Sequence, residues 1–225
     1  MSLHLAIILD GNRRFAKRLM LEPWKGHEYG AKRVELLLEW CKEFKINELT
    51  LYSFSIQNFN RPKEEFNYLM KLFSEMFTKF ADDPRIKKNE IKIRFLGRYE
   101  LFPKELASLF KEIAEKTKNN SKFILNFAMA YGGREEIVDA IKKIVSEHPE
   151  PEKITEDYVE KHLYIDSAPD IIIRTGGEKR TSNFLPWQSV YSELFFIDKT
   201  WPEFEKEDLV NILNEYNQRE RRFGK

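Results

Sequence analysis

The sequence contains a single cysteine, Cys41, among its 225 residues, which excludes an internal disulfide and a zinc site built from several cysteines. No apolar run approaches the ~20 residues that a membrane-spanning helix needs, and we expect neither a transmembrane segment nor a signal peptide. Neither sign of charge is in excess, since 38 Lys and Arg stand against 37 Asp and Glu. These absences predict a cytoplasmic protein with no nucleic-acid partner.

What the sequence does contain predicts one globular domain over residues 1–225. Hydrophobic residues make up 42% of the chain and aromatic residues 14%, with 18 phenylalanines, enough for a continuous core without cross-links. Cys41 lies within a helical pattern, which favours a packed and inert thiol.

Short apolar runs alternate with helical patterns along the chain. The runs predict strands at 5–9, 49–55, 91–97, 123–130 and 170–174, of which 91–97 alternates as an edge strand does. The stretches between them predict helices at 28–44, 63–81, 103–118, 133–147, 155–163 and 205–220. This alternation predicts an α/β fold, a mainly parallel central sheet with helices on both faces.

Polar segments follow four of the predicted strands, at 10–14, 55–61, 131–134 and 174–182. In parallel sheets, ligands bind beyond the carboxyl ends of the strands. Every one of these segments carries arginine, whose guanidinium can donate two hydrogen bonds to phosphate oxygens. One edge that holds Arg14, Arg61, Arg174 and Arg180 favours one or two diphosphates over a single phosphate.

Asp10 would be repelled by phosphate at this edge unless a cation lies between them. Mg²⁺ is the expected cation, because it takes one or two carboxylates and completes its shell with phosphate oxygens and water. Neither a Walker A motif nor a complete GxGxxG motif is present, so nucleotide binding has no direct support.

The predicted helix at 63–81 is apolar around more than one face. Its length of roughly 28 Å could wall a long cavity beside the diphosphate edge, although an ordinary core helix is the simpler interpretation for any one of its residues. Burial of a hydrocarbon ligand there would contribute about 0.8 kcal/mol per methylene. An apolar chain with a diphosphate head is the ligand class that this combination predicts.

Several long motifs in order resemble the cis-prenyltransferase family, of the undecaprenyl diphosphate synthase type. The resemblance covers residues 4–224 and rests on the stretches "HLAIILDGNRRFAKR", "GHEYGAKRV", "LTLYSFSIQNFNRP", "LNFAMAYGGREEI", "PDIIIRTGGEKRTSNFLPWQSVYSELFF", "WPEF" and "NQRERRFG". It implies an apolar tunnel within the fold and repeated condensation of isopentenyl diphosphate onto an allylic diphosphate primer, farnesyl or geranylgeranyl, with Mg²⁺. A medium-chain polyprenyl diphosphate, the precursor of a lipid carrier, would be the product.

The resemblance also implies a role for each matching residue. It makes Asp10 and Asn58 catalytic, with Asn58 orienting a water or a diphosphate oxygen because an amide is a poor base. It assigns the metal to Asp10 and Glu193. It assigns the substrates to Gly11, Asn12, Arg13, Arg14, Phe15, His27, Ser55, Ile56, Gln57, Phe59, Arg61, Arg174, Arg180, Thr181 and Ser182.

Partners and product length follow from the same resemblance. A homodimer is implied, with Arg222-Phe223-Gly224 reaching across the interface, whereas peripheral membrane association through the product stays open. Phe123 matches a residue near the tunnel floor, and its bulk predicts a limited chain. Against the family pattern, Pro23 replaces an arginine and Lys179 a histidine, which leaves primer preference and the metal's shell open. Gln57 replaces a glutamate, and Phe15 and Phe59 replace tryptophans.

Other interpretations stay open at this point. Within the fold, the chain could be a short-chain or altered-acceptor enzyme. As a non-catalytic partner subunit it would be expected to have lost the Asp and Arg set, which it retains. A phosphate- or RNA-binding protein is disfavoured, because no stripe of aromatic and basic residues is present.

Overall fold

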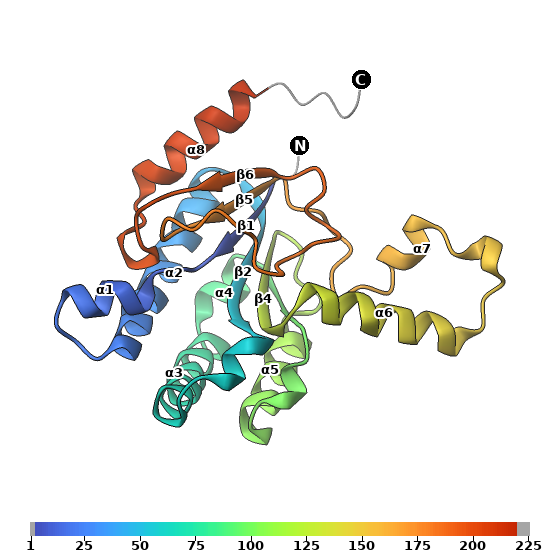
Figure 1. The fold of residues 1–225 in the computed structure, drawn as a ribbon, viewed down its shortest axis with the longest axis horizontal. Coiled ribbons are helices and arrows are strands. Elements are labelled where there is room, and N and C mark those ends of the chain that lie inside the picture. The colour runs from blue at the N-terminus through green and yellow to red at the C-terminus, as the bar shows by residue number, and fades with distance from the viewer. Residues whose placement is uncertain (1–2, 220–225) are drawn as a thin grey trace.

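A six-stranded parallel sheet organises the computed structural model, which describes residues 3–219 (Figure 1). Its strands, in the spatial order β3-β4-β2-β1-β5-β6, are β1 (Leu3–Ile8), β2 (Ile46–Ser55), β3 (Ile91–Leu96), β4 (Phe123–Tyr131), β5 (Ile171–Arg174) and β6 (Glu193–Phe196). Each strand runs parallel to its neighbours, with Ile8 of β1 opposite Tyr52 of β2 and Arg174 of β5. The carboxyl ends of these three central strands therefore meet at one edge.

Helices connect the strands and cover the sheet. They are α1 (Asn12–Arg18), α2 (Gly26–Glu43), α3 (Lys63–Ala81), α4 (Pro84–Lys88), α5 (Lys104–Thr117), α6 (Gly133–Glu147), α7 (Glu156–Glu160) and α8 (Lys206–Gln218). Short 3₁₀ turns lie at η1 (Pro23–Lys25), η2 (Ile56–Asn60), η3 (Tyr99–Leu101), η4 (Pro151–Lys153) and η5 (Trp201–Glu203).

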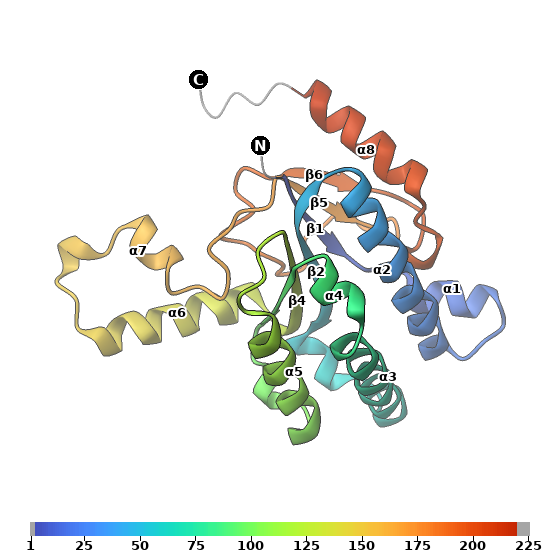
Figure 2. The ribbon, with the colours of Figure 1, turned by 180° about the vertical axis from the view of Figure 1, so that it is seen from behind.

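The two faces of the sheet are packed differently. Figure 2 shows α2, α3, α4 and α5 in front of one face, where their apolar sides join an aromatic-rich core. Phe77 of α3 lies at its centre, with its ring 5.0 Å from those of Phe110 and Phe127. We call this the helical face.

The opposite face is covered by long segments together with the start of α6. Buried residues there include Ala128 and Tyr131 of β4, Ile165, and Phe184 and Leu185 from the segment between β5 and β6. Beyond this contact, α6 and α7 project from the body of the molecule (Figure 1). We call this the loop-covered face.

The predicted elements and their α/β arrangement are confirmed, and β3 is an edge strand as its alternation indicates. Several elements were not predicted: α1, α4 and β6 are too short to give a periodic pattern. The helix predicted at 155–163 is only the five residues Glu156–Glu160. None of the described helices is long and apolar enough to cross a membrane.

Candidate active site

Asp10 is held where β1 ends by contacts from two distant segments. Its backbone carbonyl accepts hydrogen bonds from Trp201 N at 2.8 Å and from Thr175 Oγ1 at 2.7 Å. Gly11 then turns the chain with φ of 104°, and a Cβ there would lie 2.6 Å from Thr200. Only glycine fits this turn, which starts α1 directly behind the Asp10 carboxylate.

The Asp10 carboxylate forms ion pairs with two arginines. Oδ2 accepts a hydrogen bond from Arg174 Nη2 at 2.8 Å, and Oδ1 accepts one from Arg14 Nη2 at 3.2 Å. Arg174 is 5% exposed, and its Nη1 donates to the carbonyl of Arg180 and to Ser182 Oγ at 2.8 Å. Its buried Nε has no partner within the described residues. The sheet edge thus offers one carboxylate among oriented guanidinium donors.

A second cluster of charges surrounds the buried carboxylate of Glu65, at the start of α3. Oε1 accepts from Arg61 Nη1 at 2.6 Å, and His27 Nε2 and Arg13 Nε each lie 3.8 Å from one of its oxygens. Contact with His27, together with the charges of Arg61 and Arg13, lowers the pKa of Glu65 to about 2. Burial lowers the pKa of His27 and so disfavours its charged form, and its Nε2 lies 3.2 Å from Arg61 Nη1.

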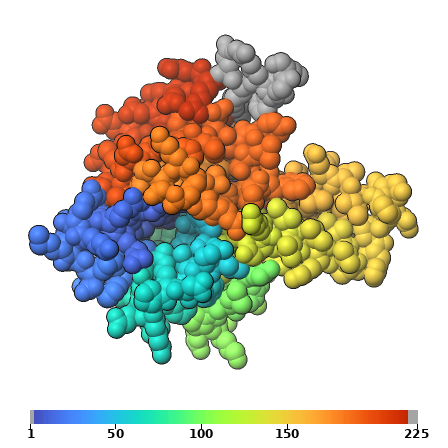
Figure 3. Space-filling model, viewed as in Figure 1, coloured from blue at the N-terminus to red at the C-terminus, as the bar shows by residue number. Residues whose placement is uncertain are grey.

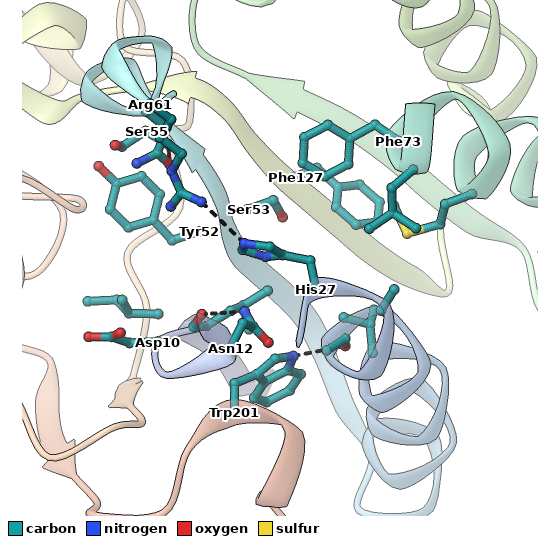
Figure 4. A pocket seen from close by; sticks show the side chains of 18 of the residues that line it. Asp10, Asn12, His27, Tyr52, Ser53, Ser55, Arg61, Phe73, Phe127 and Trp201 are labelled. Carbon is teal, nitrogen blue, oxygen red and sulfur yellow. Dashed lines mark hydrogen bonds between the residues drawn. The ribbon is translucent and has the colours of Figure 1, made fainter. Parts of the chain in front are cut away.

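Glycine spacing in "GHEYG" brings α1 against α2. A Cβ on Gly26 would lie 1.9 Å from the carbonyl oxygen of Asn12, and one on Gly30 would lie 2.3 Å from Asn12 Oδ1. These two glycines are four residues apart and so lie on one side of α2. Trp201 Nε1 donates to the carbonyl of Gly30 at 2.9 Å, which holds this contact in place. His27 is consequently brought beside Arg61 (Figure 4).

The turn η2 carries the predicted reactive loop. Asn58 Oδ1 accepts from Ser55 N at 3.0 Å, and Ser55 accepts from the backbone of Asn58 in return, which is a capping box. Phe59 packs against Phe54, with ring centroids 5.1 Å apart. Among the neighbouring residues, Ile56 contacts the core while Gln57 is exposed.

Two adjoining cavities lie within this frame. The first, of about 360 Å³, is lined by Leu9, Asp10, Gly11, Asn12, Arg13, Arg14, Lys17, His27 and Arg61. The second, of about 280 Å³, shares Asp10, Asn12, His27 and Arg61 with it and adds Ser55, Asn58 and Arg174. Its far wall is apolar and includes Leu72, Phe73, Met76 and Phe127. Figure 4 shows His27 between the polar side chains and Phe73 and Phe127, and Figure 3 shows the opening to solvent.

Other residues predicted at the site lie elsewhere in the described chain. Glu193 is opposite Ile171, whereas Arg174, the partner of Asp10, is opposite Phe196, so Glu193 is three strand positions away. Its carboxylate accepts from Arg219 Nη1 at 2.5 Å. Residues 3–219 contain no group of three or more carboxylates, histidines or cysteines able to hold a metal. Asp10 and Glu193 therefore lie at different levels of the sheet, and a metal held by both stays a prediction.

Two more predicted residues, Phe15 and Arg180, are not among those that line the two cavities. Phe15 packs on Tyr29, with ring centroids 5.1 Å apart, and Arg180 pairs with Glu178 at 2.5 Å. Thr181 is half-buried between Arg180 and Ser182. The C-terminal Arg222-Phe223-Gly224 lies outside the described residues.

Glu65, which joins Arg13, Arg61 and His27 from three elements, was not predicted from the sequence. Its signal was present in "RPKEE", where an acidic residue follows Arg61 by four positions at the start of a helix. Tyr52 and Trp201 were also missed, although both line the second cavity. Trp201 begins the matching stretch "WPEF", but its contact with Gly30, 171 residues away, could not be predicted from that stretch.

The site combines hydrogen-bond donors suited to phosphate with an apolar wall, and this combination defines a protein that acts on amphiphilic diphosphates. Comparisons with known proteins agree with this class. The family model described as "putative undecaprenyl diphosphate synthase" matches residues 8–224. A Pyrococcus furiosus protein, a tritrans,polycis-undecaprenyl-diphosphate synthase described as geranylgeranyl-diphosphate specific, is 49% identical over 99% of this chain and 86% of its own. An isoprenyl transferase of Thermus thermophilus is 45% identical over 99% of this chain and 88% of its own.

Solved structures show the same fold. Lavandulyl diphosphate synthase from Lavandula x intermedia, in complex with dimethylallyl diphosphate, superposes with a TM-score of 0.93 at 33% identity, over 99% of this chain and 98% of that one. A probable undecaprenyl diphosphate synthase from Campylobacter jejuni gives 0.85 at 30% identity, over 100% and 99% of the two chains. The chain belongs to the undecaprenyl diphosphate synthase family and is a prenyltransferase of the cis-polyprenyl diphosphate synthase type.

Proposed function

We propose that this prenyltransferase extends geranylgeranyl diphosphate with isopentenyl diphosphate and releases a medium-chain, undecaprenyl-type diphosphate. The observation that carries the proposal is the direct connection between the arginine-rich edge at Asp10 and an apolar cavity wall. The relatives from Pyrococcus furiosus and Methanocaldococcus jannaschii, the latter 47% identical over 99% of this chain and 82% of its own, support the choice of primer.

The proposed reaction joins the two substrates by one carbon–carbon bond. The bond between C1 of the primer and its diphosphate breaks, C4 of isopentenyl diphosphate bonds to C1, and a proton leaves C2. Arg13, Arg14 and Arg61 face the cavity from two sides and stabilise the negative charge that develops on the departing diphosphate. Apolar residues behind them keep water from the reacting carbons.

Asn58 can orient a substrate group, but its amide cannot itself remove the proton from C2. Its Oδ1 is already occupied by Ser55 N, so the group left to the substrates is the Nδ2 donor. We assign it the positioning of a diphosphate oxygen, which then takes the proton from C2.

Mg²⁺ is the proposed cofactor, held by Asp10. The donor set fits, because a single accessible carboxylate beside phosphate-binding arginines is what Mg²⁺ uses when substrate oxygens complete its shell. When bound, the ion neutralises diphosphate charge and assists its departure. Arg174 and Arg14, which pair with the Asp10 carboxylate, are the guanidiniums placed to bind phosphate oxygens beside it.

We further propose a cytoplasmic homodimer that associates through α6. Val138, Ile141 and Val145 form a stripe on this helix, with exposed fractions of 45%, 51% and 63%. The helix projects from the body (Figure 1), so a second copy can pack along it. Ile141→Glu should convert the dimer to monomer in light scattering, and an unchanged mass would remove α6 from the interface.

A panel of allylic primers tests the function. The full chain is incubated with Mg²⁺, isopentenyl diphosphate and dimethylallyl, farnesyl or geranylgeranyl diphosphate, and the products are identified by mass spectrometry. The proposal requires long polyprenyl diphosphates, formed fastest from the geranylgeranyl primer. A product with a single added unit, or a branched one, would favour a short-chain or altered-acceptor enzyme, and no incorporation from any primer would contradict the proposal.

A further inference from the structure

Beyond the cavity at Asp10, hollows lined by both apolar and charged residues reach the opposite end of the sheet. A groove of about 630 Å³ between α2 and α3 shares Val34, Leu72, Met76 and Phe127 with the cavity beside Asp10. A third hollow, of about 410 Å³, shares Leu38 and Phe80 with that groove. The three form one path, because each shares wall residues with the next.

Three elements carry this path in the same direction. On α2 it passes from Val34 through Leu38 to Lys42, a rise of about 12 Å, and on α3 it runs from Met76 to Phe80. On β4 it passes from Phe127 to Phe123, which lie on the same face of the strand about 13 Å apart. The path therefore ends where β2, β3 and β4 begin.

The third hollow opens to solvent rather than ending in a closed floor. We call it the basal opening and define it by its apolar lining of Leu38, Ile46, Phe80, Ile86, Ile91 and Phe123. Phe123 is only partly buried at this position, so it lines the opening without sealing it.

Three of the four lysines on the rim of the basal opening lack carboxylate partners, whereas Lys122 pairs with Glu90 at 2.5 Å. Lys42, Lys45 and Lys88 are exposed, and within residues 3–219 no carboxylate lies within 4.0 Å of any of the three ammonium groups. Lys42 donates only to the neutral Asn89 Oδ1, at 3.2 Å. By contrast, Arg85 on the same rim pairs with Asp83 at 2.6 Å and Glu39 at 3.5 Å. The hollow is thus lined by five cations and three carboxylates, Glu35, Glu39 and Asp83, which leaves an excess of two positive charges beside its apolar residues.

We propose that the basal opening docks on an anionic lipid bilayer, into which the hydrocarbon end of the growing chain emerges. The inference rests on the proposed function, since only a long apolar product needs such an exit. Lysines around an apolar mouth match a bilayer surface, because anionic headgroups attract the ammonium groups while the acyl region accepts the hydrocarbon. An anionic soluble protein would satisfy the lysines but offers nothing to an apolar chain.

Vesicle sedimentation tests the docking. The full chain is mixed with vesicles of phosphatidylcholine and phosphatidylglycerol in equal parts, or of phosphatidylcholine alone, in low salt. We expect binding to the anionic vesicles to fall by on the order of a hundredfold in the triple variant Lys42→Gln/Lys45→Gln/Lys88→Gln. The matched control is Lys111→Gln/Lys153→Gln/Lys161→Gln, which neutralises three other exposed lysines without carboxylate partners and should bind like wild type. Equal binding to both vesicle types, or equal loss in both variants, would overturn the proposal.

A single label on the rim tests the orientation. Cys41 is fully buried, so a cysteine at Asn47, on the rim, can be labelled selectively with an environment-sensitive fluorophore. Lipids brominated on the acyl chain should quench a label at Asn47→Cys and not one at Glu152→Cys, and the reverse would contradict docking through this opening. Failure of the primer panel would refute the proposed function, whereas these two measurements report only on the lipid surface.

Discussion

Glu65 on the helical face and Glu136 on the loop-covered face are both deeply buried, and the two carboxylates differ in their partners. Glu65 and Glu136 are both 1% exposed. Glu65 is surrounded by His27, Arg61 and Arg13, and its pKa is lowered to about 2. Glu136 accepts from the neutral donors Tyr131 Oη, Tyr164 N and Gln188 Nε2, and its burial raises its pKa.

The difference shows how one sheet can hold an adaptable site on one side and a fixed scaffold on the other. Charges around Glu65 line an open cavity, where a diphosphate can compete with the carboxylate for the same guanidiniums. The donors around Glu136 join β4, α6 and the segments that carry Tyr164 and Gln188. We therefore expect changes on the helical face to alter both catalysis and stability, and changes on the loop-covered face to alter stability alone.

The largest effect on activity is expected from a substitution of Asp10, whose role in the site no residue on the loop-covered face shares. Asp10→Ala removes the proposed Mg²⁺ ligand and the anchor of Arg174 and should lower turnover on the order of a thousandfold, with only a modest loss of primer binding. Incorporation of radiolabelled isopentenyl diphosphate measures the effect. Near-normal incorporation by a folded variant would remove Asp10 from the mechanism.

A matched pair of substitutions tests the comparison itself. Glu65→Gln leaves the buried guanidinium of Arg61 without its counter-charge and should cost about 3–5 kcal/mol in the free energy of unfolding. Glu136→Gln replaces one acceptor oxygen by a donor and should cost about 1–3 kcal/mol. Activity is measured under conditions where both variants are folded. It should fall with Glu65→Gln and stay close to wild type with Glu136→Gln. Equal losses of activity would contradict the proposed difference between the two faces.

The pH dependence of stability should have opposite signs at the two sites. Because the folded-state pKa of Glu65 is depressed, its contribution is complete above the unfolded value of 4.5 and is lost as the pH falls toward about 2. The pKa of Glu136 is raised, so its contribution is present below 4.5 and is lost as the pH rises through the folded-state value.

Urea denaturation over a pH series checks these signs. The cost of Glu136→Gln should shrink as the pH rises from 4.5, while the cost of Glu65→Gln should stay constant over the same range. Parallel slopes for the two variants would show that their environments do not differ as described.

A smaller effect, on product chain length, is expected from a substitution of Phe123, where the apolar path meets the basal opening. Phe123→Ala widens the end of the path and should shift the product distribution toward longer chains, with little change in the rate of incorporation. Mass analysis of the products measures the shift, and Phe110→Leu, which changes a fully buried ring outside the path, is the control. An unchanged distribution would show that Phe123 does not limit the chain.

The sequence was sufficient to predict the parts of this comparison that depend on local pattern. Apolar runs that end in Asp10 and in Arg174 predicted the sheet edge, and the apolar surface of the helix at 63–81 predicted a cavity wall. The family resemblance selected the side chains that the cavities bring together at Asp10, Arg14, His27 and Arg61. Each of these features lies within one short segment.

Features that depend on register or on distant contacts could not be predicted in the same way. Glu193 belongs to a matching motif, but the pairing of β5 with β6 decides where along the strand it lies. Burial of Glu65 requires α1, α2 and α3 to converge, and the basal opening depends on how far α2 and α3 diverge. Neither packing arrangement leaves a periodic signal in the chain.

The central claim is that the diphosphate head lies at Asp10 while the hydrocarbon runs along the helical face. Photo-crosslinking with a geranylgeranyl diphosphate analogue that carries a diazirine at its hydrocarbon end tests this claim most directly. Peptide mapping should place the label on α3 or on β4 near Phe127, and excess inorganic diphosphate should reduce it. Labelling of α6 or of the segment around Phe184 would put the hydrocarbon on the loop-covered face and contradict the account.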